Sequence, residues 1–229
     1  MKWIYSLYAL AALGVLLSFD VFWEYESVHI ISKSLLIPIL IVAVLLSGPI
    51  NPHRRLLIAA LVFCSCGDVF LLFQEEELYF MLGLGAFLSA HILYAMLFRK
   101  TVDHSHNIPI LMRIKLWTFL FIILGAAMFL YLRPDLGKME IPVLLYTIAI
   151  TIMAMMAFNR HGRADNSNFW LVFGGAMLFM ASDTIIGIDK FKDPFPCANY
   201  WIMVLYMLSQ WMIVKGVLKH EGVSAKAVG

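Results

Sequence analysis

The chain has 229 residues, of which 62% are hydrophobic and only 14% are charged, with a formal net charge of +2. A soluble globular domain carries roughly 45–50% apolar and roughly 25% charged residues, so this composition excludes an ordinary soluble fold of this length. The small, scattered positive charge gives no reason to expect a nucleic-acid partner. Apolar runs of about 18–20 residues, separated by short polar clusters, predict an integral membrane protein.

Eight such runs follow one another, each long enough to cross a bilayer as a helix. Their approximate ranges are 3–19, 30–47, 55–73, 78–98, 114–132, 141–158, 169–187 and 199–217. The first run is longer than a signal-peptide core and no small-residue cleavage site follows it, so it is interpreted as a span. Because the connections are short, we expect an all-α membrane protein: a bundle of eight transmembrane helices in a single domain, residues 1–229.

Basic residues occur at both chain ends and in every second connection between the predicted spans. They are Lys2, then Arg54 and Arg55, then Arg99, Lys100, Arg113 and Lys115, then Arg160 and Arg163, and finally Lys219 and Lys226. The intervening connections are acidic or mixed, as at Glu75–Glu77. By the positive-inside rule, this alternation over eight spans predicts that both termini are cytoplasmic. In a bacterium, the protein would lie in the cytoplasmic (inner) membrane.

Two spans that run in the same direction share a short pattern. In each span, a small residue and an aspartate are followed, after two intervening residues, by an aliphatic residue: Gly67-Asp68 with Leu71, and Ser182-Asp183 with Ile186. Each pattern lies near the outer end of its span. A parallel duplication of four spans, a 4+4 repeat, would produce this correspondence. Coincidence between two apolar helices would produce it as well, so both interpretations stay open.

Apart from Arg55, Lys115 and Lys215 at the cytoplasmic ends of their spans, the ionisable residues inside the predicted spans are Lys33, Asp68, His91 and Asp183. A charged side chain at bilayer depth costs about 2.5–3.5 kcal/mol on insertion scales, so such residues usually face the bundle interior and usually have a function. Both aspartates are predicted to lie about 6–8 Å below the outer edge of their helices, from the helical rise per residue. Lys33 is predicted at a similar level, and His91 deeper.

Further polar residues are predicted to share helix faces with these groups. On one helix, spacings of three and four place on one face Phe80, Gly83, Phe87, His91 and Tyr94. The last span carries on one face Asn199, Tyr206 and Gln210. These faces would supply hydrogen-bond donors and acceptors to a buried pocket. Cys64, Cys66 and Cys197 lack metal-ligand spacing, so we expect neither a metal site nor a cofactor.

Each candidate also has a structural interpretation. Asp68 and Asp183 could pair with Lys33 or cap neighbouring helices, and Lys33 could reach the membrane interface. His91 could be a satisfied core histidine, while Tyr206 and Gln210 could bind neighbouring helices. If the two carboxylates meet at low dielectric, they cannot both ionise easily, and one keeps its proton near neutral pH. Such a pair suits cleavage through oxocarbenium-like states, and it suits a proton relay in a transporter equally well.

Several motifs occur in a distinctive order from the second predicted span to the eighth. They are Lys33-Ser34-Leu35-Leu36-Ile37-Pro38, Gly67-Asp68, Phe80-x-x-Gly83-x-x-Ala86-Phe87-x-x-Ala90-His91-x-x-Tyr94, Phe173-Gly174-Gly175-Ala176-Met177-Leu178-Phe179-x-x-Ser182-Asp183, Asn199-Tyr200 and Gln210. This set resembles the YhhN-like lysoplasmalogenase family of multi-pass membrane proteins. The resemblance implies hydrolysis of the vinyl ether bond of lysoplasmalogens, which releases a fatty aldehyde and a glycerophospho-ethanolamine or -choline.

For that reaction we hypothesise that Asp68 and Asp183 are the catalytic residues. One would protonate the β-carbon of the vinyl ether, and the other would stabilise the oxocarbenium ion and position water. Lys33 would bind the phosphate of the lysophospholipid, and His91 would orient water or an aspartate. The substrate pocket would be completed by Tyr94, Asn199, Tyr206 and Gln210. No oligomeric state is predicted.

Two other classes of function are kept as alternatives. A proton-coupled transporter or lipid-moving protein should have helices interrupted by Gly or Pro around a midplane site. Pro38, Pro109 and Pro142 are interpreted as lying at or near span ends, which favours the hydrolase. A structural or partner-binding membrane protein would have Asp68 and Asp183 directed to different places, with no common cavity.

Overall fold

The computed structural model describes residues 2–20, 26–102 and 108–228, and within these residues the regular secondary structure is entirely helical. The long helices are α1 (Lys2–Asp20), α2 (Glu26–Leu46), α3 (Pro52–Phe70), α4 (Glu77–Lys100), α6 (Lys115–Leu132), α7 (Glu140–Phe158), α8 (Asn166–Phe191) and α9 (Ala198–Val228). Short helical segments lie between them: η1 (Leu71–Phe73), α5 (Ile110–Arg113), η2 (Arg133–Asp135) and η3 (Gly137–Met139). Each predicted apolar run is therefore helical, and α9 continues well beyond its predicted end.

Six helical segments of the described chain are long and apolar enough to cross a membrane. They are Pro52–Phe73, Glu77–Lys100, Lys115–Asp135, Gly137–Phe158, Asn166–Phe191 and Ala198–His220. Two shorter apolar segments, Trp3–Ser18 and Ile30–Leu46, belong to α1 and α2. The protein is an integral, multi-pass membrane protein.

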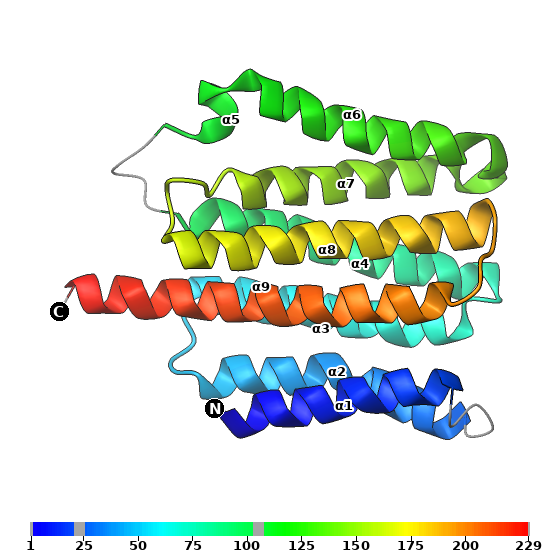
Figure 1. Ribbon diagram of the computed structural model, residues 1–229, viewed down its shortest axis with the longest axis horizontal. Helices are drawn as coiled ribbons and strands as arrows, with labels where there is room; N and C mark the ends of the chain where they lie inside the picture. Colours follow the sequence, from blue (N-terminus) through cyan, green and yellow to red (C-terminus); the bar gives the residue numbers. More distant parts are fainter. Residues whose placement is uncertain (1, 21–25, 103–107, 229) are drawn as a thin grey trace.

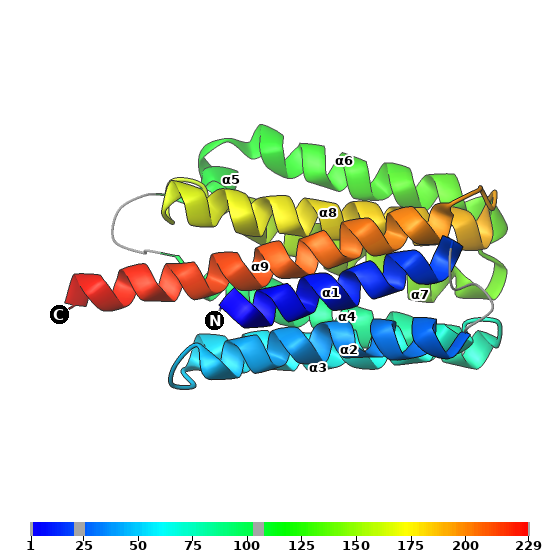
Figure 2. The ribbon, with the colours of Figure 1, turned by 60° about the horizontal axis from the view of Figure 1, so that its bottom comes forward.

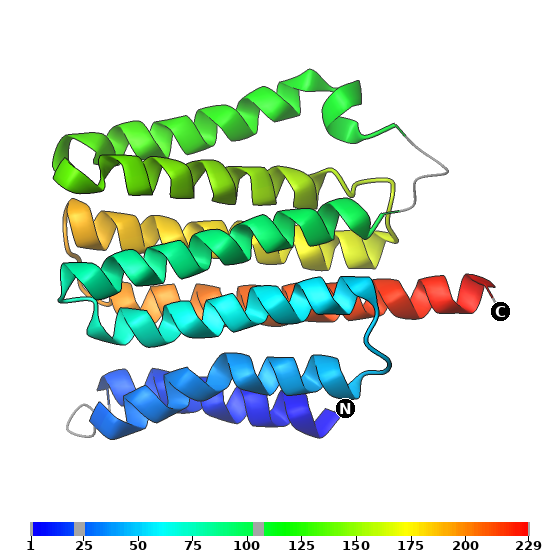
Figure 3. The same cartoon turned by 180° about the vertical axis from the view of Figure 1, so that it is seen from behind.

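The long helices lie along a common axis in two rows (Figure 1). The first row contains α7, α4, α3 and α2, each in contact with the next, and Figure 3 shows it from behind. The second row contains α8, α9 and α1, which lie side by side in Figure 2. Contacts of α7 with α8 and of α1 with α2 join the rows, and α6 packs at the edge against α7 and α8. Both chain ends lie at the same end of the bundle (Figure 1).

The two helices that carry the predicted catalytic aspartates begin at side-chain caps. The side chain of Asn51 accepts a hydrogen bond from the backbone N–H of Arg54 at 2.9 Å, and Pro52 occupies the first turn of α3. Asp165 accepts from the backbone N–H of Ser167 at 3.2 Å at the start of α8. These caps satisfy backbone donors that have no partner inside the helix.

Two glycines allow close approach of neighbouring helices. A Cβ atom added to Gly67 would lie 2.6 Å from ring atoms of Phe87, so α3 and α4 pack here because residue 67 has no side chain. A Cβ atom added to Gly175 would lie 2.9 Å from the backbone oxygen of Ser209, which holds α8 against α9. In both cases the missing side chain permits an approach that small residues commonly provide between membrane helices.

One sequence prediction about proline is wrong. Pro38 lies inside α2, well away from both helix ends. A proline in a membrane helix is tolerated because neighbouring helices and local adjustments satisfy the freed backbone groups. Pro142 lies near the start of α7, as predicted. The positions of the prolines therefore give no argument against a transporter.

Candidate active site

A polar cavity of about 440 Å³ lies at the end of the bundle opposite the two chain ends. Its polar lining residues are Lys33, Asp68, Gln74, Glu75, Ser182, Asp183, Asp189, Lys190, Asn199 and Tyr206. These residues come from α2, α3, α8 and α9 and from the connection that follows α3. Both predicted catalytic aspartates therefore line a single cavity, although α3 and α8 are far apart in the sequence.

A second, apolar cavity of about 70 Å³ adjoins the first. It is enclosed by side chains of η1, α4, α6, α7 and α8, and its polar lining residues are Tyr146, Thr147, Asp183 and Thr184. Four residues border both cavities: Leu71, Phe87, Asp183 and Ile186. Asp183 supplies the carboxyl group at this junction, whereas Asp68 borders only the polar cavity.

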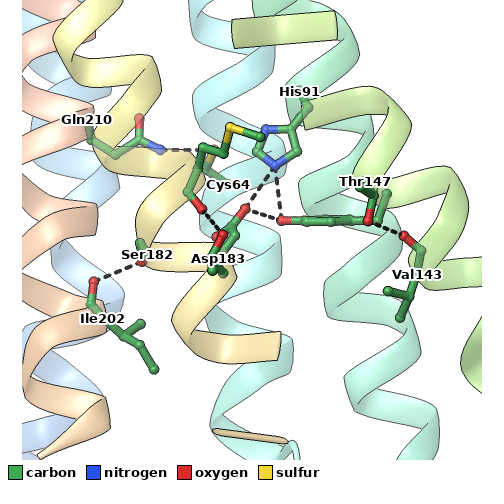
Figure 4. Close-up of polar contacts among 11 residues, drawn as sticks. Cys64, His91, Val143, Thr147, Ser182, Asp183, Ile202 and Gln210 are labelled. Atoms are coloured by element: carbon green, nitrogen blue, oxygen red, sulfur yellow. Dashed lines mark hydrogen bonds and ion pairs between the residues drawn. The ribbon is translucent and has the colours of Figure 1, made fainter. Parts of the chain in front are cut away.

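Asp183 is held by side chains from two other helices. Its Oδ2 atom accepts a hydrogen bond from the hydroxyl of Tyr146 on α7 at 2.5 Å. Nε2 of His91 on α4 lies 3.1 Å from the same oxygen and 3.0 Å from the Tyr146 hydroxyl oxygen. Figure 4 shows the His91 ring directed toward Asp183. The three side chains thus form a closed triangle of polar contacts.

The surroundings of His91 indicate which nitrogen carries its proton. His91 is fully buried, and its Nδ1 atom has no hydrogen-bond partner in the described part of the chain. An unsatisfied buried donor costs roughly 1–3 kcal/mol, so a proton on Nδ1 is disfavoured. We therefore assign the proton to Nε2, from which it is donated to Asp183.

His91 was predicted to lie deeper than the aspartates, and its ring reaches Asp183. Side chains on a helix lean toward its N-terminus. Helices α4 and α8 run in opposite directions (Figure 1), so the His91 ring leans toward the cavity end and the Asp183 carboxylate leans away from it. The two side chains meet because both lean toward the space between their backbones.

Asp68 has a simpler environment. Its Oδ2 atom accepts a hydrogen bond from the hydroxyl of Tyr206 on α9 at 2.8 Å, and both residues are buried. Lys33 lines the same cavity, yet it forms no ion pair with Asp68 within the part of the chain that the structure describes. Asn199 lies at the exposed margin of the cavity, at the start of α9.

Tyr94 and Gln210 are not among the residues that line either cavity. The Tyr94 hydroxyl donates to Oε1 of Gln210 at 2.6 Å. Nε2 of Gln210 lies 3.3 Å from Sγ of Cys64, and Figure 4 shows Gln210 directed toward Cys64. These three buried side chains join α4, α9 and α3 beside the site. A contact of Tyr94 or Gln210 with a substrate stays a prediction, and their position outside both cavities does not favour it.

Sequence reasoning missed Tyr146, because uncharged polar residues were predicted to line the site on the helix of His91 and on the last span, and not on the span that became α7. A tyrosine carries no formal charge, and it is common near membrane interfaces. Its polar neighbours Thr147 and Thr151 were the available signal, since they mark the interior face of α7. Within the described residues, no group of three or more His, Cys, Asp or Glu side chains could hold a metal ion.

The chain is similar to known proteins over most of its length. The YhhN family model matches residues 28–217. The lysoplasmalogenase TMEM86A of Bos taurus is 32% identical over 175 residues, which cover 75% of this chain and 68% of that protein. The lysoplasmalogenase TMEM86B of Homo sapiens is 30% identical over 172 residues, covering 75% and 67% respectively. The lysoplasmalogenase of Mycobacterium bovis is 30% identical over 159 residues, covering 67% and 56%.

No solved structure matches the chain. The family match extends from the start of α2 into α9 and so includes both aspartates and the helices that contact them. By this match and by the identity with these relatives, the chain belongs to the YhhN family.

Proposed function

We propose that this protein is a membrane hydrolase that cleaves the vinyl ether bond of lysoplasmalogens, with Asp68 and Asp183 as the catalytic residues. The observation that carries the proposal is the shared cavity: both carboxylates line it, and Asp183 stands where it meets the apolar cavity. The relatives named lysoplasmalogenase support the same reaction. The products are a fatty aldehyde and a glycerophospho-ethanolamine or -choline.

The two cavities suit the two parts of a lysophospholipid. The polar cavity, at about 440 Å³, falls within the roughly 300–1,000 Å³ typical of small-molecule sites and would receive the glycerophosphate head group. The apolar cavity, at about 70 Å³, has room only for the first carbons of the alkenyl chain. The rest of the chain would leave between helices into the surrounding lipid. The vinyl ether, which joins head and chain, would then lie beside Asp183.

Other lining residues would bind the head group. Lys33 would pair with the phosphate, because a lysine supplies a full positive charge and up to three hydrogen-bond donors. Asn199 at the margin and Tyr206 beside Asp68 would contribute further hydrogen bonds. We place His91 behind Asp183 rather than against the substrate, since His91 lines neither cavity.

We further propose that the chain forms one eight-span domain with both termini in the cytoplasm. Eight helices of the described chain have 18 residues or more, and the two chain ends lie at the same end of the bundle (Figure 1). Arg54 and Arg160, at the same end of the bundle as the termini, follow the positive-inside rule. The polar cavity would then open on the non-cytoplasmic side, and a bacterial member would occupy the inner membrane.

The 4+4 repeat is part of this proposal. The order of helix contacts in the first half, α1 to α2 to α3 to α4, is repeated by α6 to α7 to α8 to α9. One constant interval in the sequence relates Gly67 to Ser182, Asp68 to Asp183, Phe87 to Ile202 and His91 to Tyr206.

These related residues also form related contacts. Asp68 is bonded by Tyr206 of the second half, and Asp183 by His91 of the first half. Gly67 packs against Phe87, while the Ser182 hydroxyl donates to the backbone oxygen of Ile202 at 2.9 Å. A two-fold relation between the halves would bring the two aspartates to one cavity.

The proposal is tested with purified protein and lysoplasmalogen in detergent micelles. Aldehyde release is expected from the wild type and is expected to fall at least about 1,000-fold in Asp68→Asn and Asp183→Asn, the scale of losing a catalytic acid or base. Asp135→Asn, on the connection between α6 and α7, serves as the matched control. An ester-linked lysophospholipid should not be cleaved. Activity that survives both aspartate substitutions contradicts the mechanism.

The second candidate is a proton-coupled transporter or lipid-moving protein that uses the same aspartates. Pro38 inside α2 is the observation that favours it, because proline is common within the membrane helices of transporters, although α2 itself is continuous. Its test is uptake of lysophospholipid into sealed proteoliposomes under a proton gradient. Movement of intact lipid without aldehyde release would support this candidate over the hydrolase.

A further inference from the structure

We infer that the two aspartates have different tasks: Asp183 is the acid that protonates the vinyl ether, Asp68 activates the water, and Tyr146 and His91 are positioning residues for Asp183. This inference rests on the proposed hydrolysis and assigns the acid of that reaction.

The position of Asp183 between the cavities is the first argument. In a vinyl ether, O–CH=CH–R, the carbon that receives the proton is the one on the side of the hydrocarbon chain. With the head group in the polar cavity and the chain in the apolar one, this carbon faces the carboxyl group that borders both, which is Asp183. Asp68 borders only the polar cavity, from which water would reach the ether carbon.

The second argument is the orientation of the Asp183 carboxyl group. Both polar neighbours, Tyr146 and His91, contact Oδ2. Oδ1 has no hydrogen bond within the described residues, so it is the oxygen available to carry a transferable proton. When that proton leaves, the negative charge forms on a carboxylate whose Oδ2 already accepts two hydrogen bonds. Donors placed in advance stabilise developing charge without reorganisation at the moment of reaction.

The third argument is the difference between the two halves of the chain. His91 and Tyr206 stand at related positions and each contacts the aspartate of the other half. Tyr146 has no such counterpart. At the interval that relates Asp68 to Asp183, the residue of the first half that corresponds to Tyr146 is Ile31. Ile31 is exposed and has no polar group to offer Asp68. The extra donor is therefore specific to Asp183, and it makes two otherwise related carboxyl groups chemically different.

The steps balance as follows. The proton on Asp183 Oδ1 passes to the chain-side carbon, the C=C electron pair forms the new C–H bond, and an oxocarbenium ion results. Water attacks the other carbon while the Asp68 carboxylate takes a proton from it, which gives a hemiacetal. The hemiacetal hydroxyl proton moves to the glycerol oxygen as the C–O bond breaks, which releases the aldehyde. Water in the polar cavity then returns the proton from Asp68 to Asp183.

The first experiment compares Tyr146→Phe with Tyr8→Phe. Tyr8 is a matched control, a buried tyrosine on α1 whose hydroxyl donates to the Met207 backbone oxygen and which lies outside both cavities. Tyr146→Phe should lower kcat about 10- to 100-fold with little change in KM, because the lost contact acts on the charge of the transition state. It should also enlarge the solvent deuterium isotope effect on kcat, since proton transfer to carbon becomes slower. His91→Gln should act in the same direction.

Unchanged kcat in Tyr146→Phe, or an equal loss in Tyr8→Phe, overturns the positioning role. A purely structural effect would lower the amount of folded protein without changing the isotope effect.

The second experiment separates the two aspartates with azide, which can capture an oxocarbenium ion without a general base. Asp68→Asn with azide should yield the azido ether adduct, detected by mass spectrometry, and Asp183→Asn should yield none. The reverse pattern, or no adduct from Asp68→Asn, overturns the assignment of the acid. Wild-type protein that releases no aldehyde from lysoplasmalogen would instead overturn the proposed function itself, and the inference with it.

Discussion

The hydroxyl of Tyr206 on α9 lies 2.8 Å from Oδ2 of Asp68 on α3, although 138 residues separate them in the sequence. The bond joins one row of helices to the other, and both residues line the polar cavity. Because both residues are buried, the hydroxyl is the hydrogen-bond donor that replaces water for this oxygen. The bond therefore fixes where the Asp68 carboxyl group stands relative to the cavity.

Replacing Tyr206 with Phe tests this relationship. We expect kcat/KM for lysoplasmalogen to fall about 10-fold, since a hydrogen bond to a charged group contributes about 1.5–3 kcal/mol and part of it can be recovered by water from the cavity. The substitution should have no further effect in an Asp68→Asn background, because the two residues act as a unit. Tyr8→Phe is the control and should stay near wild type. Full additivity of the Tyr206 and Asp68 substitutions would contradict the coupling.

Gly67 is predicted to be indispensable for the packing beside Asp68. In Gly67→Ala the new Cβ atom meets the Phe87 ring, and the two helices must separate or the ring must move. We expect a loss of about 1–3 kcal/mol in stability, the usual cost of overpacking, together with reduced activity. Gly85→Ala is the matched control on α4, where an added Cβ meets nothing within 4 Å. Thermal unfolding in detergent measures the stability of both variants, and equal melting temperatures would refute the packing argument.

Lys33 is predicted to recognise the phosphate of the substrate. Lys33→Gln should raise KM for a lysoplasmalogen about 10-fold, the scale of one lost charge-assisted hydrogen bond, with little change in kcat. An alkenyl glycerol, which has the vinyl ether and no phosphate, should be cleaved equally well by both proteins. Lys215→Gln, on α9 with its ammonium group over the Trp211 ring, is the control for loss of a lysine. If Lys33→Gln impairs cleavage of the alkenyl glycerol as much as cleavage of lysoplasmalogen, Lys33 has a role other than phosphate binding.

The native cysteines test the topology. Cys197 is exposed in the connection between α8 and α9, at the cavity end of the bundle, whereas Cys64 is buried and Cys66 lies on the exposed surface of α3 within a span. A membrane-impermeant maleimide added to intact cells should therefore label Cys197, and Cys197→Ser should abolish the label. Labelling from the cytoplasmic side alone, in inverted vesicles, would place the termini outside and reverse the proposed orientation.

The sequence was sufficient to predict the helices and the interior position of the two aspartates. Long apolar runs can only be accommodated in the bilayer as helices, since every backbone group must be satisfied within the segment. A carboxylate inside such a run is costly in lipid, so Asp68 and Asp183 had to face the interior of the bundle. The motif order around them also predicted the family, which the match to residues 28–217 confirms.

The partners of those aspartates could not be predicted from the sequence. Tyr146 was missed because an uncharged tyrosine is inexpensive in a membrane helix, and only the packing of α7 beside α4 and α8 makes it a donor to Asp183. Depth counted along a helix ignores the direction in which side chains lean, so it could not show that the His91 ring reaches Asp183. The sequence by itself determined which groups must be buried, since burial follows from local composition. Tertiary structure decided which of them meet, because those contacts join helices that are distant in the chain.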